Sequence, residues 1–104
     1  MNKAPLSRTV TVRNPNGLHA RPADLLVRLA SKFESNILIG KDAEQVDCKS
    51  ILSVLTLAAA QGTVLSLSAD GNDAADALES IAQLFEAGFD DTNPVQGAER
   101  AVDS

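Results

Sequence analysis

A turn runs directly into a helix in the stretch Asn14-Pro15-Asn16-Gly17-Leu18-His19-Ala20-Arg21-Pro22-Ala23. Its first four residues all favour turns, so a strand that precedes them has to end there. Pro22 is tolerated in the first turn of a helix, because the amides of that turn have no carbonyl partner within the helix. The stretch therefore predicts that a helix begins at Ala20, directly after His19.

The residues on either side of this junction follow the two regular periods. Upstream, Thr9–Val12 alternates with period two, which predicts a strand. Downstream, apolar residues recur at helical spacing and predict one buried stripe, formed by Ala23, Leu26, Val27, Ala30 and Phe33. Arg28 and Lys32 follow near the end of this helix, where positive charge complements the helix dipole.

The remainder of the chain continues to alternate between strands and helices. A second strand at Ile37–Ile39, a turn at Gly40–Asp42 and a third strand at Gln45–Lys49 form a predicted hairpin. Ser50 then opens a short helix, Gln61–Gly62 breaks the pattern, and a fourth strand follows at Thr63–Ala69. A turn at Asp70–Asp73 ends with caps for a last helix, whose inner stripe consists of Ala74, Ala77, Leu78, Ile81 and Phe85. Gly88 closes that helix, and Phe89 folds back onto its last turn.

The order βαββαβα predicts an α+β domain with its helices on one face of a sheet. A length of 104 residues, of which 44% are hydrophobic, fits one domain with one core. We place this domain at residues 1–89. Residues 90–104 are polar and predict a mobile tail.

Composition excludes several classes of function. Aromatic residues make up only 3% of the chain and the net charge is −5, which argues against nucleic-acid binding. One cysteine, Cys48, and one histidine exclude an intramolecular disulfide and the usual zinc sites, so we expect no metal and no cofactor. No signal peptide or membrane-spanning run is visible, which predicts a cytoplasmic protein without membrane insertion.

Charge is divided unequally along the chain. Residues 1–49 carry eight basic and five acidic side chains, whereas residues 50–104 carry one basic and nine acidic side chains. The basic half is suited to contact with an acidic partner, although ordinary surface variation can produce the same division.

The residues where the turn meets the helix predict an anion-binding site. The backbone amides of Ala20 and Arg21, the positive end of the helix dipole and the Arg21 guanidinium all favour a phosphate beside His19. A neutral imidazole is a competent nucleophile near neutral pH. No carboxylate that could activate water precedes Asp24, so the pattern favours a histidine that accepts a phosphoryl group and keeps it. The alternative is a helix-start histidine beside a solvated arginine.

At these residues the chain resembles the HPr family, the histidine-containing phosphocarriers of the phosphoenolpyruvate-dependent phosphotransferase system. The resemblance spans about residues 7–89, and the matching segments are Asn16–Ala23, Lys49-Ser50-Ile51-Leu52, Gln61-Gly62-Thr63 and Ala69-Asp70-Gly71. The tail after Asp90 departs from the family.

The resemblance implies a fold and a role. The fold is an open-faced β-sandwich, in which three helices cover one face of four antiparallel strands. His19 corresponds to the residue that phospho-enzyme I phosphorylates on a ring nitrogen, the pros nitrogen, and that passes the group to a IIA domain. Arg21 corresponds to the arginine that assists the transfer. The protein is then a monomeric, stoichiometric carrier and not an enzyme.

A second site is implied at Ser50. The matching serine is phosphorylated in many bacteria by HPr kinase/phosphorylase, whereas the simpler interpretation is a helix cap. The helix after it is too short to bury all its apolar residues, so Ile51, Leu52 and Leu55 are candidates for docking partners. Arg28 and Lys49 are candidate charges at the rim. Cys48 is expected in the core.

Three other functions stay open. The protein could act mainly as a regulatory interaction protein, whose phosphorylated Ser50 docks a transcriptional regulator. It could serve the nitrogen branch, because Leu84–Asp91 is similar to the ending of NPr-type carriers. A small hydrolase that uses His19 is the third alternative, and the absence of a second acid–base group counts against it.

Overall fold

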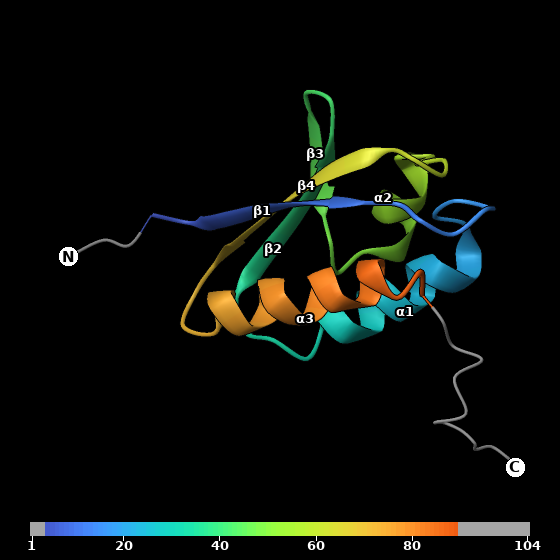
Figure 1. The fold of residues 1–104 in the computed structure, drawn as a ribbon. Helices are drawn as coiled ribbons and strands as arrows, with labels where there is room; N and C mark the ends of the chain where they lie inside the picture. The colour runs from blue at the N-terminus through green and yellow to red at the C-terminus, as the bar shows by residue number, and fades with distance from the viewer. Residues whose placement is uncertain (1–3, 90–104) are drawn as a thin grey trace, which may run out of the picture.

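The computed structural model describes residues 4–89 and shows four strands and three helices in the predicted order (Figure 1). The elements are β1 (Leu6–Thr11), α1 (Ala20–Ala30), β2 (Asn36–Lys41), β3 (Glu44–Asp47), α2 (Ile51–Thr56), β4 (Val64–Asp70) and α3 (Ala74–Glu86). The predicted tail at 90–104 lies outside the described residues.

The strands form one antiparallel sheet in the order β1-β4-β2-β3. The β2–β3 hairpin is confirmed, and β4 lies between β1 and β2. Figure 1 shows α1 and α3 against the same side of this sheet, and α2 contacts α1 and β3. The predicted α+β open-faced sandwich is therefore confirmed.

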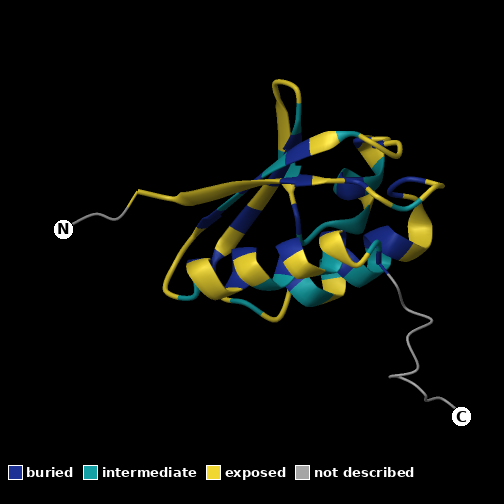
Figure 2. Ribbon diagram, viewed as in Figure 1, coloured by how far each residue is buried: buried dark blue, intermediate teal, exposed yellow. Residues whose placement is uncertain are grey.

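The two faces of the sheet differ in polarity (Figure 2). The helix-covered face buries alternate residues of the central strands, which are Ile37, Ile39, Leu65, Leu67 and Ala69. Between them, Ser66 and Ser68 are half-buried and Leu38 is exposed on the open face. The alternation of period two therefore directs one face of each strand into a largely aliphatic core.

Helix α1 ends earlier than the apolar spacing predicted. It stops at Ala30, so the placement of Phe33 within the helix was wrong. The amides of Lys32 and Phe33 bond to carbonyls three residues back, at 3.1 and 3.2 Å, which tightens the chain after the helix. Phe33 still packs against the core, and the Lys49 ammonium donates to its carbonyl at 2.7 Å.

The hairpin turn lies two residues later than predicted. Gly40 and Lys41 belong to β2, and the turn residues are Asp42 and Ala43, with Asp42 at φ +57°. Aspartate is one of the few residues that adopt positive φ with tolerable strain. Gly40 is needed for close packing instead, because a Cβ there would lie 2.8 Å from the Glu44 carbonyl oxygen.

Helix α3 ends as the sequence predicted. Gly88 has φ +67°, its amide bonds to the Phe85 carbonyl, and the Phe89 amide bonds to the Leu84 carbonyl, both at 3.0 Å. This is the Schellman pattern. The Phe89 ring is buried and meets Phe85 edge to face, with ring centroids 4.8 Å apart. The described chain therefore packs against the core up to its last residue, Phe89.

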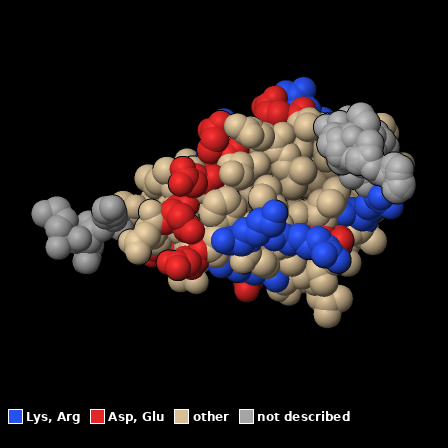
Figure 3. All heavy atoms as spheres, turned by 90° about the horizontal axis from the view of Figure 1, so that it is seen from below, with Lys and Arg blue, Asp and Glu red and all other residues tan. Residues whose placement is uncertain are grey.

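Charge is separated on the side of the molecule that carries α1 and α3 (Figure 3). In this view most Asp and Glu side chains lie to the left, whereas Lys and Arg side chains gather in the middle and to the right. The helix-covered side therefore has an acidic end and a basic end.

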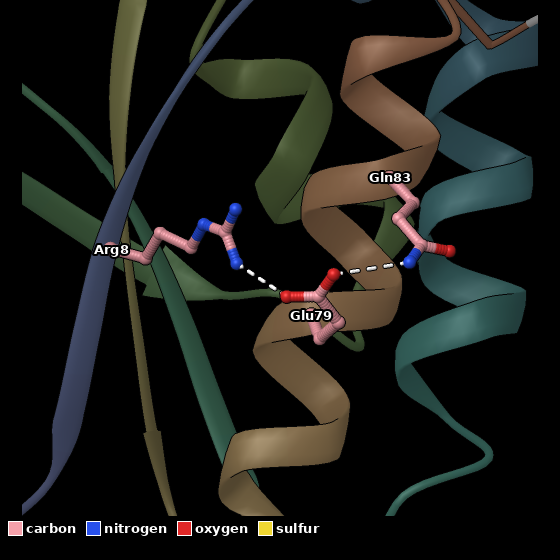
Figure 4. A network of polar contacts seen from close by, with 3 residues as sticks. All are labelled: Arg8, Glu79 and Gln83. Atoms are coloured by element: carbon pink, nitrogen blue, oxygen red, sulfur yellow. Dashed lines mark hydrogen bonds and ion pairs between the residues drawn. The ribbon is translucent and has the colours of Figure 1, made fainter.

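A polar network joins β1 to α3 (Figure 4). Arg8 donates to one oxygen of Glu79 at 2.8 Å, and Gln83 donates to the other at 3.1 Å. The hydrogen bond from Arg8 is the largest of the effects that lower the pKa of Glu79. Both charged side chains are exposed, so the network contributes little to the free energy of unfolding.

Asp73 joins two loops that are distant in sequence. It is the N-cap residue of α3, as the sequence predicted, but its carboxylate makes no cap hydrogen bond. It accepts hydrogen bonds from the Ser35 hydroxyl at 2.6 Å and from the amides of Glu34 and Ser35 at 2.8 and 3.0 Å. The Ser35 hydroxyl and the Glu34 amide therefore lower the pKa of the Asp73 carboxyl from its ordinary 3.8.

Asp73→Asn is expected to flatten the acid limb of the stability curve. Because the unfolded chain has the ordinary pKa, the contribution of Asp73 is fully present above about pH 4 and is lost as pH falls through its lowered native pKa. Urea unfolding at several pH values measures this slope. Asp76→Asn removes an exposed acid in the first turn of α3 and serves as control. An acid limb equally steep in Asp73→Asn and Asp76→Asn would contradict the assignment.

Candidate functional site

His19 lies where the turn becomes a helix, as the sequence predicted. It is the N-cap residue of α1, with extended backbone angles (φ −86°, ψ −166°), and its carbonyl accepts the first helical hydrogen bond from the Ala23 amide at 2.9 Å. Its side chain makes no cap hydrogen bond and is exposed to solvent. The imidazole is therefore accessible to another molecule and is not engaged in holding the helix.

The loop before His19 is held tightly. The Gly17 amide donates to the Asn14 carbonyl at 3.0 Å, and the Asn14 side-chain amide donates back to the Gly17 carbonyl. The Leu18 amide donates to the Ala59 carbonyl at 2.8 Å, and the Leu18 side chain is only 3% exposed. Because the amide of Leu18 is hydrogen-bonded and its side chain is buried, the position of Leu18 is fixed. The backbone of the next residue, His19, is thereby positioned as well.

The first turn of α1 has the composition that an anion site requires. Ala20 and Arg21 are exposed, Pro22 is buried, and no acidic residue lies in this turn. No carboxylate of this turn therefore neutralises the positive end of the helix dipole. Asp24 lies one turn later, and its carboxylate accepts a hydrogen bond from Arg28 Nε at 2.8 Å.

A hollow of about 310 Å³ opens beside His19. The residues that line it are Asn16, Leu18, His19, Leu55, Ala58, Ala59 and Ala60. Of the three predicted docking residues, the structure brings Leu55 to His19. Leu52 is 73% exposed, and Ile51 is half-buried. The segment Ala58–Ala60 was missed, because no chemical property of three alanines could have identified it from the sequence.

Ser50 is the N-cap of α2, and its hydroxyl accepts a hydrogen bond from the Ser53 amide at 3.3 Å. It lies five residues before Leu55, which corresponds to about 7.5 Å along the helix axis. His19 and Ser50 therefore flank α2 from its two ends. The capping interpretation of Ser50 is confirmed, and the residue is half-buried.

Cys48 is inert in this arrangement. Burial, with a smaller effect from the neighbouring Asp47, raises the pKa of its thiol to about 12. Its amide donates to the Ile37 carbonyl at 2.9 Å. The prediction of a small core residue is confirmed.

Residues 4–89 offer neither a metal site nor a membrane-spanning helix. No cluster of three or more His, Cys, Asp or Glu side chains there could hold a metal ion. No helix in the described part of the chain is long and apolar enough to cross a membrane.

Comparison with known proteins gives a consistent result. The family model of the PTS HPr component phosphorylation site matches residues 6–87. Phosphocarrier protein HPr of Xylella fastidiosa is 42% identical over 86 residues, which cover 83% of this chain and 97% of that protein. The HPr-like protein Crh of Halalkalibacterium halodurans is 38% identical over 81 residues, 78% of this chain and 96% of that protein.

A solved structure extends the likeness to three dimensions. The crystal structure of HPr-C-His from Thermoanaerobacter tengcongensis superposes with a TM-score of 0.79 at 43% identity, over 81% of this chain and 94% of that one. Three findings agree with one another. The elements have the same order, an exposed histidine lies at the start of α1, and the family model matches most of the domain. The chain therefore belongs to the HPr family, the phosphocarrier proteins of the phosphotransferase system.

Proposed function

We propose that this chain accepts a phosphoryl group on His19 from phospho-enzyme I and passes it to a IIA domain. The observation that carries the proposal is the position of His19, an exposed N-cap whose side chain is not used for capping. In this role the chain is a stoichiometric carrier of the cytoplasm, and catalysis belongs to its partners.

Each transfer exchanges one bond to phosphorus for another. The pros nitrogen of the His19 ring, Nδ1, attacks phosphorus, and the bond between phosphorus and enzyme I breaks with its electron pair remaining on enzyme I. In the second transfer a nucleophile of the IIA domain attacks, and the electron pair of the phosphorus–nitrogen bond returns to His19. No water takes part in either step.

The surroundings of His19 stabilise the transferred group. The amides of Ala20 and Arg21 lie in the first turn, at the positive end of the dipole of α1, and the guanidinium of Arg21 is a permanently charged donor for phosphate oxygens. No carboxylate of this turn competes for those donors or activates water. This environment suits a phosphohistidine that survives until the next partner binds.

Partners dock on the apolar surface next to the phosphoryl acceptor in this proposal. Leu55 lines the hollow that His19 also lines, and Leu52 extends the apolar area with a largely exposed side chain. Ile51 is half-buried at the start of the same helix, and Arg28 supplies a charge at the rim.

Regulation at Ser50 is the second candidate function, and the likeness to the HPr-like protein Crh favours considering it. Phosphorylation by HPr kinase/phosphorylase would add about −1.5 to −2 charges at the start of α2, which the helix dipole tolerates. The added charge would lie on the helix that carries the docking residues. It would alter the binding of enzyme I, or of a transcriptional regulator, without unfolding the domain.

Ser50→Asp is expected to slow phosphorylation by enzyme I about tenfold, the effect of about 1.4 kcal/mol. Asparagine and aspartate cap helices equally well, so Ser50→Asn is a neutral control of the same shape. Initial rates of label transfer from phosphoenolpyruvate measure the difference. Equal rates for Ser50→Asp and Ser50→Asn would contradict a role for charge at this position.

The direct test of the proposed function is incubation with phosphoenolpyruvate and enzyme I. Stable, acid-labile label on His19 supports the carrier. Label that enters only from ATP, on Ser50, supports the regulatory protein. Continuous release of free phosphate supports the hydrolase.

A further inference from the structure

In the described part of the chain, residues 4–89, the left-handed backbone conformation occurs at three residues other than glycine. They are Asp42 (φ +57°), Ala58 (φ +48°) and Phe89 (φ +56°). This conformation brings Cβ close to the following carbonyl oxygen, so it costs free energy in a residue that has a Cβ. Such a conformation persists where the surrounding structure or the function of the site requires it.

For Asp42 and Phe89 the reason lies within the domain. Asp42 is in the β2–β3 turn, and aspartate is one of the residues that tolerate positive φ. Phe89 follows Gly88 at the end of α3, and its buried ring packs edge to face against Phe85. Burial of an aromatic ring offsets the cost of one left-handed residue.

Ala58 differs from both. It follows Leu57, the C-cap residue of α2, at the position where many helices have a left-handed glycine. Helix α3 has its glycine there, since Gly88 follows the C-cap residue Ala87 with φ +67°. Helix α2 has alanine instead, and this residue is exposed. Packing of the Ala58 methyl group within the domain therefore offsets little of the backbone cost.

Ala58 lies in the wall of the hollow beside His19. Both residues line this hollow of about 310 Å³, and Leu55 lines it between them. Figure 1 shows α2 at the same end of the molecule as the loop before α1. The Ala58 amide donates to the Leu55 carbonyl at 3.1 Å, and the next residue, Ala59, accepts from the Leu18 amide at 2.8 Å. Ala58 is therefore held between the end of α2 and the loop that positions His19.

The wall around Ala58 is largely apolar. Five of the seven lining residues are leucine or alanine, and the other two are Asn16 and His19. Side chains of leucine and alanine offer no hydrogen bond, so a protein that covers this wall gains most from an apolar side chain of its own. A methyl group in such a wall adds to the area that the partner removes from water.

We propose that the methyl group of Ala58 contacts an apolar side chain of the protein that loads His19. Alanine then serves partner binding at a position where glycine would serve the fold better. This inference rests on the proposed function for the identity of the partner, phospho-enzyme I. It assigns a specific contact to a residue that the chemistry of phosphoryl transfer does not use.

The size of one methyl group determines the expected effect. Its burial contributes about 0.8 kcal/mol, which corresponds to about a fourfold change in a dissociation constant. Ala58→Gly is therefore expected to raise the Kd for enzyme I, and KM for loading, by about fourfold. kcat should not change, because the methyl group touches neither the ring of His19 nor the transferred group. Since glycine adopts positive φ freely, the urea midpoint of unfolding should equal or exceed that of the wild type.

The test compares Ala58→Gly with Asp42→Gly, both in the full chain. Asp42→Gly is the matched control, because it also places glycine at an exposed left-handed residue but lies outside the hollow. Calorimetric titration of each unphosphorylated variant with enzyme I gives Kd. Initial rates of labelling from phosphoenolpyruvate, with the variant as the varied substrate, give KM and kcat, and urea unfolding gives the midpoint.

The contact predicts weaker binding without a loss of stability in Ala58→Gly, and wild-type binding in Asp42→Gly. A Kd of Ala58→Gly equal to that of the wild type would overturn the proposal. A lower kcat at unchanged Kd would also overturn it, because Ala58 would then act by positioning the His19 loop. A urea midpoint below that of the wild type would show that alanine serves the fold, and equal weakening in Asp42→Gly would show that the hollow is not involved; either result overturns the proposal.

The wild-type chain separates this proposal from the function on which it rests. If enzyme I does not label the wild type, the proposed carrier function is refuted, and this inference with it. If enzyme I labels the wild type and binds Ala58→Gly equally tightly, the carrier function stands and only the contact at Ala58 is refuted.

Discussion

His19→Gln is expected to abolish phosphoryl acceptance and to leave the fold intact. The imidazole supplies the attacking nitrogen, and a glutamine amide has no nucleophilic nitrogen of comparable basicity. Stability is expected to change by less than about 0.5 kcal/mol, because the His19 side chain is exposed and makes no cap hydrogen bond. Label from phosphoenolpyruvate, counted per chain, should fall from about one to none.

Arg21→Ala is the control that separates the acceptor from its surroundings. Removing one charged donor from a transferring group typically costs on the order of 10²–10³ in rate. The variant should therefore load slowly but still reach about one label per chain, since His19 is intact. Urea unfolding of both variants shows whether they are folded. Label retained by folded His19→Gln would refute His19 as the acceptor, and a loading rate of Arg21→Ala equal to that of the wild type would refute the supporting role of Arg21.

The parts of the site that the sequence predicted depend on local interactions. Four turn-forming residues before Leu18 and a proline in the first helical turn determine where α1 begins, and both effects act within a few residues. The position of His19 as N-cap follows from them. The exposure of His19 follows as well, because the buried residues of α1 begin only at Pro22, three residues later.

The parts that the sequence did not predict depend on contacts between distant segments. Ala59 accepts from the Leu18 amide, and Asp73 accepts from the Ser35 amide, across about 40 residues in each case. Backbone acceptors and short polar side chains leave no periodic signal for such pairs. Gly40 was assigned to a turn because glycine favours turns, whereas its small size is needed against Glu44 and Ser66 on neighbouring strands.

Gly17→Ala is expected to cause the largest combined loss of stability and transfer rate. Gly17 has φ +73°, and a Cβ there would lie 2.5 Å from the Ala59 carbonyl oxygen and 3.0 Å from Ala60 Cα. Both are backbone atoms, so the Ala58–Ala60 segment has to move. That movement breaks the hydrogen bond from Leu18 to Ala59, which positions the residue before His19.

Gly88→Ala is the matched control, because it isolates the cost of positive φ. Gly88 has φ +67°, and a Cβ there would meet nothing within 4 Å. We expect a loss of about 1–2 kcal/mol from the left-handed backbone alone in Gly88→Ala. In Gly17→Ala we expect about 3 kcal/mol, since the lost hydrogen bond and the clash add to the same backbone cost.

The transfer rate distinguishes the two glycines more sharply than stability does. Gly17→Ala displaces the loop from which His19 projects, and misplacement by about 1 Å can cost on the order of 10²-fold. Gly88→Ala leaves that loop unchanged, so its rate should match that of the wild type. Urea unfolding and enzyme I kinetics, both at a temperature where the two variants are folded, provide the measurements. Equal losses in both variants would mean that backbone strain alone acts at Gly17, and that the contact with Ala59 does not position His19.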